Sequence, residues 1–165
     1  MNIQKAIAAL KQNGFDVLFF ETAEEAAQYL DSNLDGKTIG FGDSHTLQHM
    51  NLFERLSSHN RVFHPKHCAP GKTFDDTARE CLTTEIFLTS VNAMAESGEL
   101  VNIDGRGNRV AGSLYGHQKV YFIAGTNKLT PSLEDAVWRA RNIAAPRNAM
   151  SKGFQTPCAV QGDRC

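Results

Sequence analysis

Apolar side chains recur at helical spacing in five stretches of the chain, which predict five helices. The first stretch ends near Gly14, and the second begins at Thr22 and Glu25, which have the spacing of a capping box. A helix start is also predicted at Thr130 and Pro131, because proline is favoured in the first helical turn. The apolar positions of the five stretches are Ile3, Ile7 and Leu10; the segment up to Leu30; Leu47, Met50 and Leu56; Ala78, Cys81 and Leu82; and Leu133, Ala136, Val137, Ala140 and Ala144. Beyond Pro146 the pattern becomes polar and irregular.

Short apolar runs between these stretches predict buried β-strands. They occupy residues 16–20, 38–42, 61–64, 85–89, 99–104 and 119–124, with a turn expected at 105–108. Strands that alternate with helices are typical of a parallel sheet covered on both faces. The sequence therefore predicts an α/β fold, with a Rossmann-like, mostly parallel sheet and helices on both of its faces.

Length, composition and charge indicate how many domains the chain has and which partners are not expected. The chain has 165 residues, of which 41% are hydrophobic and 21% charged, so we expect one α/β domain over 1–150 and a polar, cysteine-containing tail at 151–165. Seventeen basic and 18 acidic residues give a net charge of −1, which argues against a nucleic-acid partner. No run approaches the length of a membrane span, and the N-terminus lacks a signal-peptide pattern, so a cytoplasmic protein is expected.

One polar cluster, residues 40–46, follows the second predicted strand and opens a helix, at the sheet edge where α/β proteins bind ligands. Gly40 and Gly42 allow a ligand to approach the backbone, and a helix start favours an anion. The hydroxyls of Ser44 and Thr46 add donors, and Asp43 completes this group of ligand-binding candidates. The alternative is that Ser44 only caps the helix and that the glycines only permit a tight turn.

Two further clusters follow later strands. Asn92 stands where a strand ends, a position that suits a functional side chain and a capping residue equally well. In residues 102–109, arginines beside glycines suit a phosphate or carboxylate ligand, whereas the alternative is a surface turn with a structural ion pair. The ligand-binding candidates of this segment are Gly105, Gly107, Asn108 and Arg109. Lys128, in the turn after the last predicted strand, is a fourth contributor.

Histidines and cysteines form no complete metal motif. His64, His67 and Cys68 are close in sequence, but no second pair at ligand spacing lies near them. Cys158 and Cys165 supply half of a zinc or iron–sulfur ligand set, in a tail where burial is not expected to explain them. Other ligands would have to come from another segment or chain, so the metal and the cofactor stay unassigned.

Several segments, taken together and in this order, resemble the LUD (lactate utilisation) domain family, and in particular its C-type proteins. They are GFGDSHT at 40–46, TSVNA at 89–93, GELVNIDGRGNRVA at 98–111, GTNKL at 125–129, RNIAAP at 141–146 and TPC at 156–158. The resemblance covers nearly the whole chain. It implies the fold of the ribose-5-phosphate isomerase and CoA-transferase superfamily. Family members of this type continue past the TPC segment with further cysteines and a last strand, so the resemblance leaves open whether the chain is truncated at Cys165 or lacks that part.

The resemblance also implies a function. It favours a non-redox component of the oxidation of L-lactate to pyruvate, which binds a small anionic metabolite (a carboxylate, phosphate or CoA ester) or the iron–sulfur and oxidoreductase subunits of that system. A homo-oligomer is compatible with it. The alternative is a stand-alone isomerase- or transferase-like enzyme acting on a sugar phosphate or a CoA-linked molecule. By analogy with such isomerases, Asp104 or Glu85 would be the base and Lys128 or Arg109 the electrophile. A regulatory ligand sensor is a third interpretation.

Overall fold

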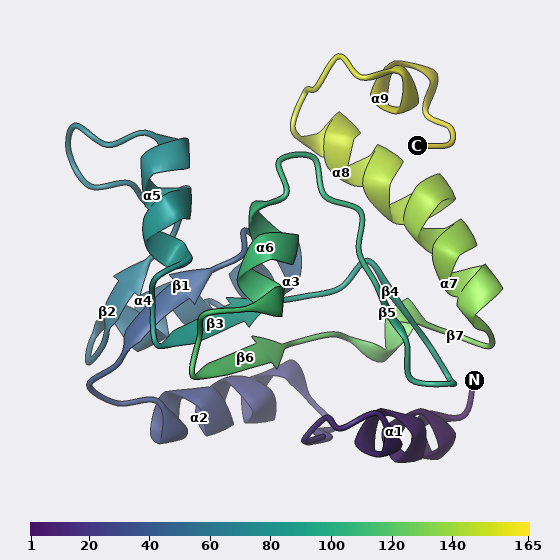
Figure 1. Ribbon diagram of the computed structural model, residues 1–165, viewed down its shortest axis with the longest axis horizontal. Coiled ribbons are helices and arrows are strands. Elements are labelled where there is room, and N and C mark those ends of the chain that lie inside the picture. The colour runs from purple at the N-terminus through teal and green to yellow at the C-terminus, as the bar shows by residue number, and fades with distance from the viewer. The chain divides into compact units, whose positions relative to one another are not determined.

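A computed structural model describes all 165 residues, which form two compact units. We call them by their sheets. The parallel-sheet unit comprises Phe19–Ser90 and Arg106–Ala124, and the mixed-sheet unit comprises Met1–Leu18, Val91–Gly105 and Gly125–Cys165. Each unit is therefore built from segments that are distant in the sequence (Figure 1).

Four parallel strands form the sheet of the parallel-sheet unit. Their order is β2-β1-β3-β6, and in the register Gly40 of β1 lies between Phe63 of β2 and Phe87 of β3. The strands are β1 (Thr38–Phe41), β2 (Arg61–Phe63), β3 (Ile86–Thr89) and β6 (Lys119–Phe122). The predicted α/β fold with a mostly parallel, Rossmann-like sheet is confirmed.

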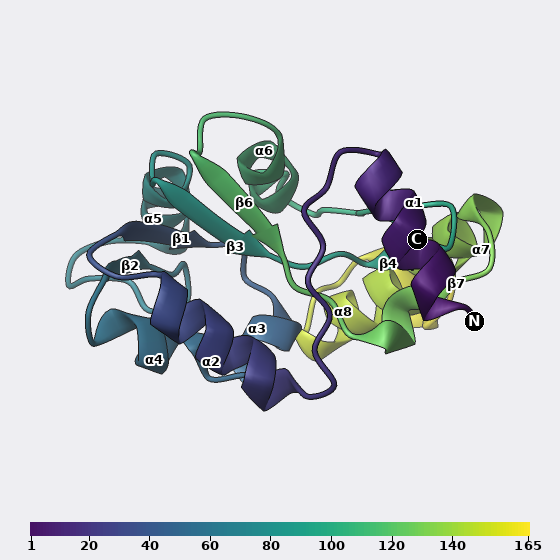
Figure 2. The same cartoon turned by 90° about the horizontal axis from the view of Figure 1, so that it is seen from below.

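Helices cover both faces of this sheet (Figure 2). On one face are α2 (Ala23–Asn33), α3 (His45–His49) and α4 (Leu52–Ser57); on the other are α5 (Phe74–Cys81) and α6 (Asn108–Leu114). Alternate strand residues point to the first face, where they form the main hydrophobic core with the leucines of α2, α3 and α4. The largest of these core residues are Leu30, Ile39, Phe41, Leu47, Leu52, Leu56, Ile86 and Leu88.

The second face is packed so closely that glycine is required at two positions. A Cβ on Gly40 would lie 2.5 Å from the backbone oxygen of Cys81, at the end of α5. A Cβ on Gly112 of α6 would lie 2.6 Å from Cζ of Phe87 on β3. Both helices therefore approach the sheet at distances that a larger residue would prevent.

The mixed-sheet unit contains a small sheet of order β5-β4-β7, in which β4 is antiparallel to β5 and parallel to β7. The strands are β4 (Ala93–Ala95), β5 (Leu100–Val101) and β7 (Leu129–Thr130). The other elements are α1 (Ile3–Gln12), the 3₁₀ turn η1 (Thr126–Lys128), α7 (Leu133–Arg139), the π-helical turn η2 (Ala140–Ala144), α8 (Ala145–Ser151) and α9 (Pro157–Gln161). Its buried core is narrow and consists of Ala93, Ala95 and Ala136.

Several predicted elements are wrong. Residues 16–20 are not a strand but an irregular segment, in which Leu18 and Phe19 are 57% and 42% exposed, because the chain passes from one unit to the other here and no strand pairs with it. The single helix expected after β1 is two helices, separated at Asn51 by a left-handed backbone (φ +50°). The turn expected at 105–108 ends instead in the first residue of α6, Asn108.

The C-terminal third also differs from the prediction. Thr130 belongs to β7, so α7 begins after Ser132, whose hydroxyl accepts the Asp135 N–H at 3.1 Å. Of the predicted buried stripe, Ala136 and Ala140 are buried, whereas Leu133 and Val137 are exposed. Beyond Pro146 the chain contains the rest of α8 and the short helix α9, where an irregular segment was expected. The π-helical turn η2 leads into α8 without a break at the proline.

Candidate functional site

Three segments meet at the carboxyl edge of the parallel sheet. They are residues 42–46 after β1, residues 64–67 after β2 and Ser90 after β3. Because β1 lies between β2 and β3 in a parallel sheet, the ends of these strands are neighbours. We call these residues the carboxyl-edge cluster.

An ion pair lies at the centre of the cluster. Asp43 has a left-handed backbone (φ +46°), which is uncommon for a residue other than glycine and marks local strain. Its buried carboxylate lies 3.0 Å from the Lys66 ammonium and accepts a longer hydrogen bond, 3.4 Å, from the Gln48 amide. Lys66 therefore compensates a buried negative charge at the edge of the sheet.

The carboxyl-edge cluster also contains three hydroxyl groups. Ser44 caps α3 by accepting the Thr46 N–H at 3.2 Å, as the capping alternative expected. Its hydroxyl hydrogen can still be donated to another group. Ser90 donates a hydrogen bond of 3.4 Å to the Thr46 hydroxyl, which connects the ends of β1 and β3.

A cavity of about 210 Å³ lies beside the cluster, between the sheet and the helices α3 and α4. Its lining consists of Phe41, Leu47, Gln48, Asn51, Phe53, Glu54, His64 and His67. The His67 ring stacks on Phe53 with 4.0 Å between centroids, and the buried His64 ring meets the His67 ring edge to face at 4.9 Å. The walls thus combine the rings of Phe41, Phe53, His64 and His67 with the polar side chains of Gln48, Asn51 and Glu54.

His64 is held in one protonation state. The Lys66 backbone N–H donates to His64 Nδ1 at 3.1 Å, so the ring proton is on Nε2. Burial, and next the charge of His67, lower the pKa of His64 to about 4, so the imidazole is neutral at pH 7. It can donate one hydrogen bond without adding charge to the cavity.

Glu85, a predicted base, lies at the opposite edge of the same sheet. It directly precedes β3, and its carboxylate accepts hydrogen bonds from the Thr38 N–H at 2.9 Å and the Thr38 hydroxyl at 3.1 Å. These bonds, with Lys37 at 3.6 Å, hold the pKa of Glu85 below its ordinary value. The structure therefore does not bring Glu85 to the carboxyl-edge cluster.

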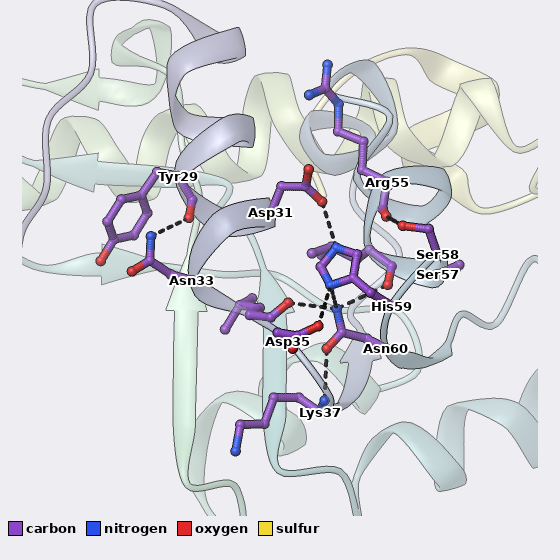
Figure 3. Close-up of polar contacts among 12 residues, drawn as sticks. Tyr29, Asp31, Asn33, Asp35, Lys37, Arg55, Ser57, Ser58, His59 and Asn60 are labelled. Atoms are coloured by element: carbon purple, nitrogen blue, oxygen red, sulfur yellow. Dashed lines mark hydrogen bonds and ion pairs between the residues drawn. The ribbon is translucent and has the colours of Figure 1, made fainter.

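A second polar group lies at this amino edge. His59 lies between Asp31 and Asp35, at 2.9 and 3.2 Å, and Asn60 joins the carbonyl of Leu34 to the N–H of Lys37 (Figure 3). These bonds connect the end of α2 to the starts of β1 and β2. We therefore interpret the group as a structural connection.

The remaining candidates are divided between the units. In the mixed-sheet unit, the side-chain oxygen of Asn92 accepts the Ile103 N–H at 2.8 Å. The backbone N–H of Asn92 donates to the side-chain oxygen of Asn102, and the backbone carbonyl of Asn92 accepts from the Arg139 guanidinium. Asn92 therefore has a structural role beside β4. Asp104, Gly105 and Lys128 also belong to this unit, and Lys128 ends the turn η1.

The rest of the arginine-rich segment belongs to the parallel-sheet unit. Gly107, whose φ is +84°, directly precedes α6, and Asn108 and Arg109 are the first two residues of that helix. Arg106 forms an ion pair with Asp75 and lies over the Phe74 ring, 4.9 Å from its centroid. Arg106 therefore forms a structural ion pair, as expected from the alternative in which residues 102–109 are a surface turn.

Packing gives Gly40 in β1 and Gly42 directly after it a role that the sequence did not suggest. A Cβ on Gly42 would lie 2.6 Å from the Thr89 hydroxyl oxygen, and Gly40 packs against Cys81 as described above. Both glycines are therefore required by the fold whether or not a ligand binds.

The structure contains no group of three or more His, Cys, Asp or Glu side chains arranged to hold a metal ion. Cys158, expected in a polar tail where burial would not explain it, is buried at 8% exposure within α9. That expectation was wrong because the tail folds into a helix. None of the helices has the length and apolar character needed to cross a bilayer.

Sequence reasoning missed three residues at the carboxyl edge: Gln48, His64 as a cavity wall, and Lys66. Residues 65–67 directly follow the strand predicted at 61–64, just as residues 43–46 follow the strand predicted at 38–42, and that shared position was the available signal. Without the strand order, nothing placed β2 beside β1.

Comparison with known proteins completes the description of the site. A search of curated proteins finds no match. Comparison with protein families matches the LUD domain over residues 3–163, which is nearly the whole chain and includes the carboxyl-edge cluster. This chain therefore belongs to the LUD domain family, which is associated with lactate utilisation.

Proposed function

We propose that the protein is a non-redox component of L-lactate utilisation and that its carboxyl-edge cluster binds a small anionic metabolite. Family membership supports the pathway. The observation that carries the binding site is the meeting of the Asp43–Lys66 pair with the hydroxyls of Ser44, Thr46 and Ser90 at one edge of the sheet.

The charges and donors of the cluster suit a small carboxylate or phosphate. Lys66 offsets the charge of Asp43, so an incoming anion does not meet an unpaired carboxylate. The Ser44 and Thr46 hydroxyls can donate to its oxygen atoms, and hydrogen bonds to charged groups are stronger than those between neutral groups. The adjacent cavity, with the neutral His64, can take the uncharged part of the molecule.

A thermal-shift screen tests this proposal. L-lactate, pyruvate, ribose 5-phosphate and acetyl-CoA are added separately at increasing concentration to the purified protein. A ligand at a hundredfold excess over its Kd stabilises the native state by about 2.7 kcal/mol. We expect such a shift with at least one of these anions.

Thr46→Val tests the position of the site because it removes a hydroxyl with little change in shape. We expect roughly a tenfold or greater weakening of Kd, since a hydrogen bond to a charged group contributes about 1.5–3 kcal/mol. The matched control is Thr83→Val, because the exposed Thr83 hydroxyl bonds only to the Glu80 carbonyl. Equal affinity of wild type and Thr46→Val would place the anion elsewhere.

The same screen separates the alternatives. Conversion of a sugar phosphate or CoA ester, lost in Asp104→Asn or Lys128→Met, would support the isomerase- or transferase-like enzyme. Absence of any shift would contradict anion binding and favour a subunit that works by binding its iron–sulfur and oxidoreductase partners. Co-purification with those subunits would then be the test.

A further inference from the structure

The helix α7 of the mixed-sheet unit carries small side chains on its inner side and large apolar side chains on its outer side. Ala136 and Ala140, at its end, are fully buried. Leu133, Val137 and Trp138 are 44%, 41% and 58% exposed. A surface helix that packs only within its own domain turns its large apolar residues toward the core. The opposite arrangement leaves an apolar surface on α7 that the chain itself does not cover.

The mixed-sheet unit buries little apolar surface elsewhere. Its core consists of three alanines with the partly buried Val101 packed against them. Most of the exposed large apolar side chains of the chain belong to this unit. Because small domains with a limited core gain stability by association with another chain, the outer side of α7 has the character of an interface.

Two opposite charges flank the apolar group on the same helix. α7 continues through η2 into α8 without a break (Figure 1). Glu134 and Arg141 are both exposed, and they lie three residues before and four residues after Val137, which places both on its side of the helix. The Arg141 Nε donates to the Cys165 carbonyl at 2.9 Å, and the two Nη groups remain available for an ion pair. We call Leu133, Glu134, Val137, Trp138 and Arg141 the α7 face.

We propose that the α7 face joins two copies of this chain by antiparallel packing of α7 against the same helix of a second copy. In a two-fold symmetric dimer each contact occurs twice. An axis between Val137 and Trp138 places Val137 of each copy opposite Trp138 of the other. The same axis places Glu134 of each copy opposite Arg141 of the other, because both are three residues from this central pair.

The charges favour a second copy over other occupants of this face. An acidic protein or an anionic membrane surface meets the Glu134 carboxylate, and a basic protein meets the Arg141 guanidinium, so each faces one like charge. A second copy in antiparallel orientation supplies the opposite charge at both positions. The net charge of −1 per chain adds little repulsion between copies.

Trp138 provides a direct readout, because it is the only tryptophan of the chain. Sedimentation velocity and tryptophan emission are measured on the full chain from about 1 to 200 µM, since a contact of this size suits a micromolar Kd. We expect the mass to rise from 18.2 kDa toward twice that value. The emission of Trp138 should shift to shorter wavelength over the same concentrations, because the ring leaves water. Trp138→Ala should weaken Kd by at least about tenfold.

Charge reversal tests the orientation. Glu134→Arg and Arg141→Glu each place like charges opposite one another twice, so each variant alone should dimerise at least about tenfold more weakly than wild type. An equal mixture of the two variants restores opposite charges at both positions and should form a heterodimer with nearly wild-type affinity. Arg147→Glu is the matched control, because it makes the same charge change about two and a half turns after Trp138, on the opposite side of the helix.

Three results would each overturn the proposal. The first is a mass of one chain at every concentration, which would leave the α7 face to a different protein. The second is a dimer whose Kd is the same in wild type, Trp138→Ala and Glu134→Arg, which would place the interface elsewhere. The third is a mixture of Glu134→Arg and Arg141→Glu that dimerises no better than either variant alone, although both keep the wild-type Tm. These measurements do not depend on the proposed anion site.

Discussion

Gly40→Ala tests the packing that positions the carboxyl-edge cluster. The added Cβ would lie 2.5 Å from the Cys81 carbonyl oxygen, 2.8 Å from the Thr84 hydroxyl oxygen and 2.9 Å from the Cys81 Cα. Two of these atoms belong to the backbone, so the contacts cannot be relieved by a side-chain rotation. Either β1 or the end of α5 must move.

The expected cost is at the upper end for overpacking, about 3 kcal/mol of the free energy of unfolding. For a chain of this size that corresponds to a fall in Tm of roughly 6–12 °C. Differential scanning calorimetry measures the change. Gly105→Ala is the matched control, because its Cβ would meet nothing within 4 Å and its φ is not in the left-handed region. An unchanged Tm for Gly40→Ala would refute the close approach of α5 to β1.

Three further predictions concern stability. The hydrogen bond that the His59 ring donates to the Asp31 carboxylate raises the pKa of His59 above 6.5, so the stabilising contribution of His59 is present below pH 6.5 and lost as pH rises through the folded-state pKa. His59→Gln should remove this step from Tm measured against pH. Hydrogen bonds from the Asn2 N–H and Lys5 lower the pKa of Glu96, so its contribution is present above pH 4.5 and lost as pH falls. Glu96→Gln should therefore be less sensitive to acid than wild type, and equal acid sensitivity would contradict this. Leu88→Ala, at a fully buried position of β3, should cost about 2–5 kcal/mol in urea denaturation.

The parallel sheet was predictable from the sequence because its signals are local. Apolar runs such as residues 38–42 and 85–89 and the capping box of Thr22 and Glu25 each form the predicted element. The same rule failed at residues 16–20, because an apolar run becomes a strand only where a partner strand is available. The predicted strand at 99–104 contains β5, although β5 is only two residues long. The strands β4 and β7 are also only two or three residues long and depend on tertiary pairing that no local pattern shows.

The candidate site was predictable only in part. The position of residues 42–46 after a buried strand was visible in the sequence, but the ion pair of Asp43 with Lys66 depends on the strand order β2-β1-β3. Two polar residues that the sequence singled out also form bonds within the fold. Asn92 bonds to Ile103, and Arg106 pairs with Asp75. Polar residues at strand ends thus occur both in ligand sites and in the hydrogen bonds and ion pairs that stabilise a fold, and their position in the sequence does not distinguish the two roles.

Amide chemical-shift mapping tests the central claim most directly. The ¹⁵N-labelled protein is titrated with the anion that gives the largest thermal shift, with sodium chloride at equal ionic strength as the control. We predict that the largest shift changes occur at Gly42 to Thr46, Lys66 and Ser90, and that they saturate with the Kd found by thermal shift. Saturable changes confined to other residues, or none beyond those caused by sodium chloride, would contradict the assignment of the carboxyl-edge cluster as the binding site.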